Sequence, residues 1–417
     1  MKAADYACQE SVVIPPEQAI PTTNEEAQDQ FRTSDVATFT IAHAAHDMYT
    51  SFVPPLLPIL IDTLGLTNTQ AGMLPVFMRL PALSQPFIGL LSDRKDLRFL
   101  VIIAPAVTGT LMTLIGYMPT FWTVALILAM VGFSSAGLHA VAPAVAVKVS
   151  GKDLGKGMSF WMVGGELGWT LGPIICVTVV GLYTIKGLPI LATIGWAASV
   201  FLFLRLRKFI DTKSVVVRTL PMSAILSEMK SIMLVIMAIL FLSSFLNAAL
   251  GTFLPVYLTQ KGVGIWLAGV SVTIVQASGV VGTLIGGSLS DRIGRRIVAL
   301  FCLVVPPLLM LLFLNAEGWV VFFLLLLMGF SAFAINPVFM ALVLDSFPEN
   351  RALANGIYLT MNFVISAVAL LLMGFAADKI GFESAYLASA ILTMLAIPFV
   401  FFLPRGKISG KASSNQT

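Results

Sequence analysis

Apolar stretches of about 20 residues recur along this chain from Thr38 to Leu403, separated by short polar or charged segments. A helix of about 20 residues is long enough to cross the hydrocarbon core of a bilayer. The chain is 58% hydrophobic and only 11% charged, whereas soluble domains are about 25% charged. These features predict an all-α membrane protein that crosses the bilayer many times.

Glycine, proline, asparagine and charged clusters interrupt the apolar chain and divide it into twelve predicted transmembrane helices. The predicted spans are 37–62, 69–92, 98–117, 120–147, 156–181, 187–205, 229–259, 265–290, 297–315, 318–344, 352–376 and 382–403. The longest polar interruption separates six spans from six. We therefore predict an N-terminal half over 37–205, a cytoplasmic linker over 206–228 and a C-terminal half over 229–404.

The polar segments predict how the chain lies in the membrane. Residues 1–36 are polar and acidic and are expected to form a disordered tail, and residues 405–417 form a second tail. Lysine and arginine gather in alternate loops, whereas the loops between them carry only Lys186, Lys261 and Lys379. Because basic loops stay inside, we expect a cell (inner) membrane protein with both termini in the cytoplasm.

The two predicted halves repeat one another. GLLSDR at 89–94 returns as GGSLSDR at 286–292, which puts Asp93 and Asp291 198 positions apart. SFVP at 51–54 resembles TFLP at 252–255, AG at 71–72 matches AG at 268–269, and GFS at 132–134 matches GFS at 329–331. Such repeats are typical of secondary transporters, which bind substrate between their halves near the bilayer midplane.

The repeated loop resembles the signature of the major facilitator superfamily. GSLSDRIGRR, residues 287–296, is a complete copy, and GLLSDRKDLR, residues 89–98, has Asp96 where the family usually has glycine. The resemblance implies a latch that holds the outward-facing state, formed by Gly89, Asp93, Arg94, Gly287, Asp291, Arg292, Gly294, Arg295 and Arg296. The alternative is that these arginines only fix the topology.

Three further stretches are similar to the fosmidomycin resistance branch of drug:proton antiporters. They are HAAHDM at 43–48, QPFIGLLSDR at 85–94, and the segment from His139 to Pro173. The chain departs from the branch at Ala140, Val141 and Glu166. The resemblance therefore does not identify the drug that this chain would transport. In the fifth span Gly164, Gly168 and Gly172 share one face, which allows close helix packing, and Pro173 can kink the span.

Two intramembrane residues of the first span, His43 and Asp47, lie four positions apart and share a helix face. A carboxylate beside an imidazole in a poorly solvated cavity can exchange a proton near neutral pH. We therefore predict that Asp47 and His43 carry a coupling proton, with Glu166 in the fifth span as a second proton candidate. A fixed salt bridge and direct substrate contact are the alternatives for Asp47.

Arg79 is the one basic residue deep within a predicted span, and a buried guanidinium needs a partner. Asp47, Glu166 and an anionic substrate are the candidates. The remaining polar residues within spans are charge-partner or substrate-binding candidates; they are His46, His139, Asn247, Gln276, Asn336 and Asn362. The repeat places Asn336 opposite His139, which suits a substrate site between the halves.

Together these features predict a secondary active transporter, a proton-coupled exporter of a small amphipathic or anionic compound by alternating access. The alternatives are a proton-coupled importer of a sugar or organic acid, an intramembrane enzyme, and a sensor or scaffold without transport. The sequence has no metal-spaced or catalytic cluster, so we expect no enzyme activity, metal or cofactor beyond a proton gradient. The expected partners are substrate, protons and lipid, with no nucleic acid, and the chain is expected to be a monomer.

Overall fold

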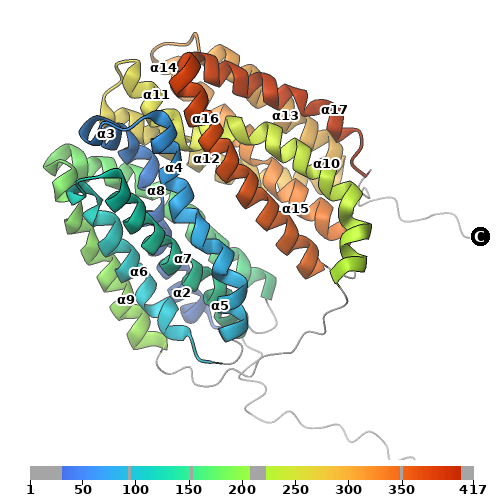
Figure 1. The fold of residues 1–417 in the computed structure, drawn as a ribbon. Coiled ribbons are helices and arrows are strands. Elements are labelled where there is room, and N and C mark those ends of the chain that lie inside the picture. Colours follow the sequence, from blue (N-terminus) through green and yellow to red (C-terminus); the bar gives the residue numbers. More distant parts are fainter. Residues whose placement is uncertain (1–30, 93–94, 151–153, 207–221, 348–350, 405–417) are drawn as a thin grey trace, which may run out of the picture.

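The computed structural model describes residues 31–92, 95–150, 154–206, 222–347 and 351–404. Within these ranges the chain is helical and contains no strand. Two lobes of helices lie side by side, the first blue to green and the second yellow to red (Figure 1). The described ranges leave out Asp93 and Arg94 of the signature loop and most of the predicted linker. They also leave out residues 1–30 of the first predicted tail and the whole second tail, 405–417.

The N-terminal half contains α2 to α9 and the C-terminal half contains α10 to α17. The first set is α2 Thr33–Thr50, α3 Val53–Leu64, α4 Asn68–Arg79, η1 Leu80–Ser84, α5 Gln85–Ser92, α6 Arg98–Thr113, η2 Leu114–Tyr117, α7 Phe121–Ser150, α8 Leu154–Tyr183, η3 Ile185–Leu191 and α9 Ala192–Leu206. The second set is α10 Met222–Ala248, η4 Ala249–Phe253, α11 Leu254–Gln260, α12 Ile265–Ile293, α13 Arg295–Phe313, α14 Trp319–Phe333, α15 Ile335–Ser346, α16 Arg351–Leu395 and α17 Ile397–Val400. Helix α10 thus begins inside the segment predicted as linker.

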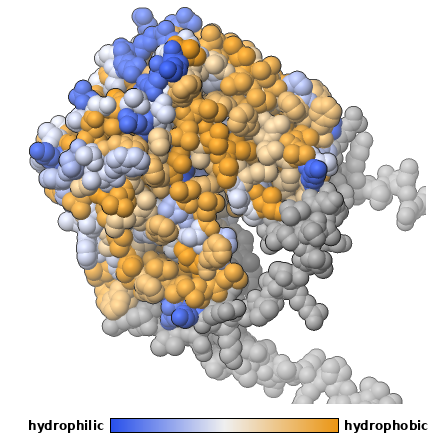
Figure 2. Space-filling view, viewed as in Figure 1, coloured by the Kyte–Doolittle hydropathy of each residue, from blue (hydrophilic) through white to orange (hydrophobic). Residues whose placement is uncertain are grey.

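Ten helices in the described ranges are long and apolar enough to cross a membrane. One of them, Gly356–Val400, covers two of the predicted spans, and a positive φ at Gly381 divides it between them. The first predicted span corresponds to α2 and α3, which a short break at Ser51 and Phe52 separates. The arrangement is consistent with twelve spans, and orange apolar residues cover most of the visible surface (Figure 2).

The repeated proline motif interrupts a helix in each half. In the first half α2 ends before Pro54, and in the second a π-helical turn, η4, precedes Pro255. A proline cannot donate the helical hydrogen bond and crowds the preceding turn, so both interruptions follow from the same local chemistry. Both interruptions contribute residues to the cavity described below.

The halves meet mainly along two helix pairs, α4 with α16 and α8 with α12, and α3 also contacts α11, α12 and η4. The repeated glycines lie at these contacts: a Cβ on Gly72 would stand 2.7 Å from the Leu370 carbonyl oxygen, and one on Gly269 would stand 2.1 Å from Val177 Cγ1. Neither position has room for a larger side chain. The Ala-Gly pairs of the repeat therefore allow the two halves to approach closely.

A carboxylate joins the halves at the far end, which we define as the end formed by Thr67, Val263 and Gly381. Asp378 of α16 accepts hydrogen bonds of 2.8 Å from the backbone N–H groups of Asn68 and Thr69, and one from the Thr69 hydroxyl. These N–H groups open α4 and have no partner within the helix. At the same end the Trp266 indole donates to Thr178 Oγ1 at 3.2 Å.

Candidate transport site

A cavity of about 260 Å³ lies between the two halves. The interrupted helices and their neighbours contribute its walls, with side chains from α2, α4 and α8 on one side and from α10, α12, α15 and α16 on the other. Its polar lining comprises Thr50, Arg79, Trp169, Ser244, Asn247, Thr252, Gln276, Asn336, Asn362 and Ser366. The structure thus brings together five residues that the sequence predicts as charge-partner or substrate-binding residues.

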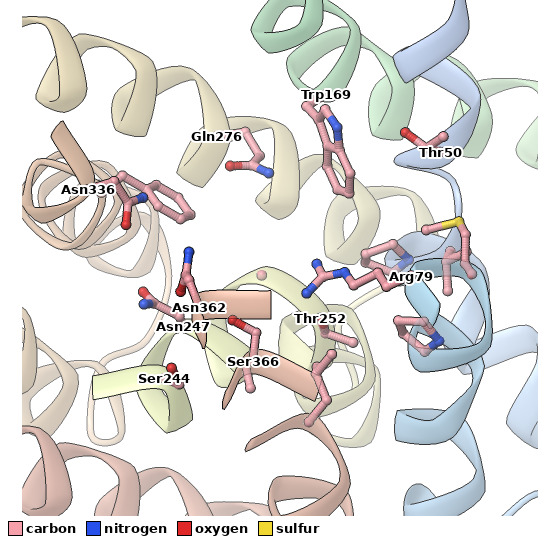
Figure 3. A pocket seen from close by; sticks show the side chains of 18 residues that line it. Thr50, Arg79, Trp169, Ser244, Asn247, Thr252, Gln276, Asn336, Asn362 and Ser366 are labelled. Atoms are coloured by element: carbon pink, nitrogen blue, oxygen red, sulfur yellow. The ribbon is translucent and has the colours of Figure 1, made fainter. Parts of the chain in front are cut away.

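Arg79 is the only charged side chain among the described residues that line the cavity. It ends α4 just before the 3₁₀ turn η1, whose Pro81 cannot continue the helical hydrogen bonding. Figure 3 shows its guanidinium reaching from the N-terminal half toward the amides of the C-terminal half. No ion pair joins Arg79 to Asp47, Glu166 or any other carboxylate in the described part of the chain, so the predicted internal pairings are absent in this conformation.

Four neutral amides line the opposite wall: Asn247 of α10, Gln276 of α12, Asn336 of α15 and Asn362 of α16. None of them hydrogen-bonds to another described residue, and Figure 3 shows them around one space. Each amide has two N–H donors and a carbonyl acceptor. This wall can therefore donate to a bound molecule as well as accept from it.

The three histidines of the chain converge on Asp47. His43 Nε2 lies 3.2 Å from Asp47 Oδ2 and 3.2 Å from His139 Nε2. His139 Nε2 is 3.8 Å from Asp47 Oδ1, and His46 Nε2 is 3.9 Å from the same oxygen. His43, His46 and Asp47 are buried. The structure therefore places His139 beside the carboxylate of α2, whereas its repeat partner Asn336 lines the cavity.

Backbone carbonyls fix the ring nitrogens of two of these histidines. His43 Nδ1 donates to the Trp161 carbonyl oxygen at 2.8 Å, and His139 Nδ1 donates to the Ser135 carbonyl oxygen at 2.9 Å. A neutral imidazole that donates through Nδ1 has a lone pair on Nε2. The two Nε2 atoms and the Asp47 carboxylate therefore present three acceptors to one another, and one added proton would give them a donor.

Glu166 lies on α8, three residues before the cavity residue Trp169. Its side chain is exposed rather than packed into the helix contact, and it interacts electrostatically with Asp47 and His43. In the described part of the chain it pairs with no basic residue. Its position near both the cluster and the cavity keeps it a candidate for proton exchange between them.

The glycine face of α8 holds this helix directly against α2. A Cβ on Gly164, Gly168 or Gly172 would lie 2.3 to 2.5 Å from a backbone carbonyl oxygen of Thr40, Ala44 or Met48. Gly165 faces the cluster itself, since a Cβ there would stand 2.7 Å from His43 Cε1. Pro173 lies inside α8, which continues to Tyr183. The close approach puts the Trp161 carbonyl within reach of His43.

The second copy of the signature loop makes contacts within its own half. Arg295 pairs with Asp291 and with Asp345 at 2.9 Å each, and Arg296 Nε donates to the Leu403 carbonyl oxygen at 2.6 Å. Gly294 adopts φ 104°, which allows the tight turn between α12 and α13. Gly287 lies within α12 and Arg292 in its last turn, while Gly89 lies in α5. The predicted switching role of these residues stays a prediction.

Several residues of the site escaped the sequence analysis. Trp161 stacks on His43 with ring centroids 3.8 Å apart, and Trp169 and Thr252 line the cavity. An apolar helix contains many such aromatic and hydroxyl residues, so nothing local distinguishes these. The available signals were the location of both tryptophans in the glycine-rich fifth span and the position of Thr252 in the repeated TFLP motif.

The acidic and imidazole groups of the cluster could also meet around one ion. His43, Asp47 and His139 each offer a ligand atom, and these atoms lie within 4.8 Å of one another. Imidazole nitrogen and carboxylate oxygen are both ligands for transition metals. The absence of a metal requirement stays a prediction from the sequence.

With this geometry established, comparison with known proteins identifies the family. The family model described as Major Facilitator Superfamily matches residues 39–305 and 267–417. This chain belongs to the major facilitator superfamily. It is therefore a multi-pass membrane protein of a family that transports small molecules. The family resemblance found in the signature loop is confirmed.

Individual relatives agree on the fold. The chain is 24% identical over 377 residues to the fosmidomycin resistance protein of Escherichia coli, covering 88% of this chain and 91% of that protein. A solved bacterial homologue of the human lysosomal transporter Spinster, inward-facing and unoccupied, superposes with a TM-score of 0.75 at 15% identity, covering 89% and 97% of the two chains. A D-xylose-proton symporter superposes with a TM-score of 0.70 at 15% identity, covering 92% and 100%.

Proposed function

We propose that this protein is a proton-coupled exporter, an antiporter that moves a small amphipathic or anionic compound by alternating access. One observation carries the proposal: His43, His139 and Asp47 present three acceptors to one another beside the cavity. A group of acceptors with no shared donor binds a proton, and releases it when the surroundings change. We assign the coupling proton to this cluster.

Helix α2 would connect the cluster to the substrate. Thr50 lines the cavity and donates to the Asp47 backbone carbonyl at 2.9 Å. A change of charge at Asp47 therefore occurs one helical turn from the cavity wall. In a poorly solvated interior, a negative charge on Asp47 and one on a substrate repel each other strongly. Protonation of Asp47 would remove this repulsion, so this link by itself favours movement of proton and anion together, and the export direction rests on the similarities described next.

The helix contacts suit alternating access by rocking of the halves. The halves touch along α4–α16 and α8–α12, with small residues at the contacts. The bonds of Asp378 to Asn68 and Thr69 hold the far end together. Opening that end would require breaking these few polar bonds and separating the glycine contacts. Each half would keep its own core during the movement.

Similarity to a resistance protein favours export over import. The glycine-rich fifth helix, which resembles the antiporter stretch, favours the same direction. Import remains the alternative, since a proton symporter shares the fold. The two directions differ in the sign of proton movement that accompanies substrate entry into a vesicle.

The test uses proteoliposomes of determined orientation with a pH-sensitive dye in the lumen. Antibiotics, phosphonates, sugars and organic acids are added outside one at a time. An antiporter exchanges entering substrate for a lumenal proton, so the lumen becomes more alkaline; a symporter makes it more acidic. If compounds enter without moving protons, proton coupling is wrong. If no compound crosses with the protein present, the transporter proposal fails for these classes.

A further inference from the structure

The charges around the cavity constrain the charge of its ligand. Arg79 is the single cation of the described lining, and no carboxylate of the described chain neutralises it. A guanidinium stays protonated in proteins, and a charge in a poorly solvated site requires a counter-charge. A ligand with one negative charge supplies that counter-charge. A ligand with two leaves one negative charge without a partner.

The donors near Arg79 favour an acceptor-only group at this end of the cavity. A guanidinium offers five N–H donors and no acceptor. Trp169 lines the same end, as Figure 3 shows. The Thr50 hydroxyl donates its hydrogen bond to the Asp47 backbone carbonyl oxygen, so it is not available as a donor to a ligand. A planar carboxylate matches the two-pronged geometry of a guanidinium.

The opposite end of the cavity favours a different chemical group on the ligand. Asn247, Asn336 and Asn362 come from three helices of the C-terminal half and have free donors and acceptors. A hydroxyl or an amide both donates and accepts, so it can satisfy such a wall. A purely apolar tail would leave these amides without partners, at a cost in binding.

We propose that the cavity binds a small organic monocarboxylate that carries a hydroxyl or amide group at its other end, and that it discriminates against dianionic phosphonates and phosphates. The inference rests on the proposed transport function and names its substrate class. Carboxylate recognition is assigned to Arg79, with Trp169 beside it. Recognition of the polar end is assigned to the amide wall.

The experiment measures binding to the purified full-length protein in the absence of any proton gradient. Each probe exists in three forms on one skeleton: 4-hydroxybutyrate, 4-hydroxybutyramide and 3-hydroxypropylphosphonate, with longer hydroxy- and amido-acids as further sets. The pH lies above the second ionisation of the phosphonate. We expect the carboxylate of at least one set to raise Tm and to bind at least about tenfold more tightly than its amide and its phosphonate, since a charged hydrogen-bonded pair is lost or mismatched.

Variants assign the selectivity to the cavity. Arg79→Gln should remove the preference for carboxylate over amide, and Arg79→Lys should retain part of it, because the charge remains without the two-pronged geometry. Lys186→Gln, which removes a positive charge from η3 outside the cavity, should leave the preference unchanged. If Arg79→Gln does not fold, the wild-type ligand series still decides.

Three outcomes overturn the inference: no carboxylate of any set binds, an amide binds as tightly as its carboxylate, or a phosphonate binds more tightly. The vesicle assay separates this inference from the transport proposal. Proton exchange with a neutral or dianionic compound would reject the monocarboxylate and keep the antiporter. Selective carboxylate binding without proton movement would reject the coupling and keep the ligand class.

Discussion

The two halves share a repeat and a helix arrangement, yet they present opposite chemistry to the space between them. The N-terminal half lines the cavity with Arg79 and holds the cluster of His43, Asp47 and His139 beside it, and all three histidines of the chain lie in this half. The C-terminal half contributes four neutral amides to the cavity. A duplicated scaffold has thus kept its packing, including the glycine contacts and the proline interruptions, while its polar positions have diverged.

This difference suggests a division of work between the halves. Ionisable groups within a membrane are costly, so they are expected only where they move charge or bind it. Amides cost less and recognise polar groups without changing charge. We infer that the N-terminal half carries the proton and the charge of the substrate, and that the C-terminal half recognises the rest of the substrate. Each prediction below tests one side of that contrast.

The largest expected effect comes from Asp47→Asn in the N-terminal half. The amide cannot gain and lose a proton, so gradient-driven transport should be abolished, while substrate exchange without a gradient continues. Both are measured as substrate flux in proteoliposomes. Asp62→Asn, which changes an exposed carboxylate of α3, is the matched control. Normal uphill transport by Asp47→Asn would contradict the division.

A smaller effect is expected from Asn336→Leu or Asn362→Leu in the amide wall. Each change removes hydrogen bonds to the substrate, so KM should rise by about tenfold, equivalent to about 1.4 kcal/mol. The number of protons moved per substrate should not change. Substrate flux and dye response, measured together, give both quantities. A loss of coupling in either variant would place proton chemistry in the C-terminal half as well.

Weakening the contact between the halves at the far end should have a moderate effect on the balance between open and closed conformations. Asp378→Asn weakens the bonds to the first N–H groups of α4 and should favour opening of that end by about 1 kcal/mol, the usual worth of a carboxylate at a helix N-terminus. Thr69→Val tests the hydroxyl bond alone. Accessibility of a single engineered cysteine in the cavity reports the opening. Unchanged labelling in both variants would mean that apolar packing alone closes this end.

The smallest effect is expected at Asp96, a carboxylate outside the spans. A hydrogen bond from Arg98 holds the pKa of Asp96 below its usual range. A lowered pKa stabilises the folded state above the ordinary carboxyl pKa, and this contribution is lost as the pH falls through the lowered value. Because the pair is exposed, Asp96→Asn should change stability by less than about 0.5 kcal/mol. Thermal unfolding across that pH range measures the change, and an effect on coupling would be unexpected.

Local patterns in the sequence predicted much of the fold and many of the polar residues of the site. Hydropathy indicated the spans because each helix must be apolar along its own length, and the break between α2 and α3 follows from Pro54. The repeat indicated the two halves, and Arg79 with the four amides stood out as polar residues within apolar runs. Boundaries were less well defined: α10 begins at Met222, within the predicted linker 206–228.

The sequence by itself determined the class of protein, the two halves and the residues able to carry chemistry, since these depend on composition and on neighbours along the chain. Only the tertiary structure decided which of them meet. His139 joins His43 across 96 positions, Arg79 faces the amides rather than Asp47, and Asp378 reaches the start of α4 across 310 positions. Such contacts depend on how helices rotate and pack against one another, which residue spacing along one helix does not specify.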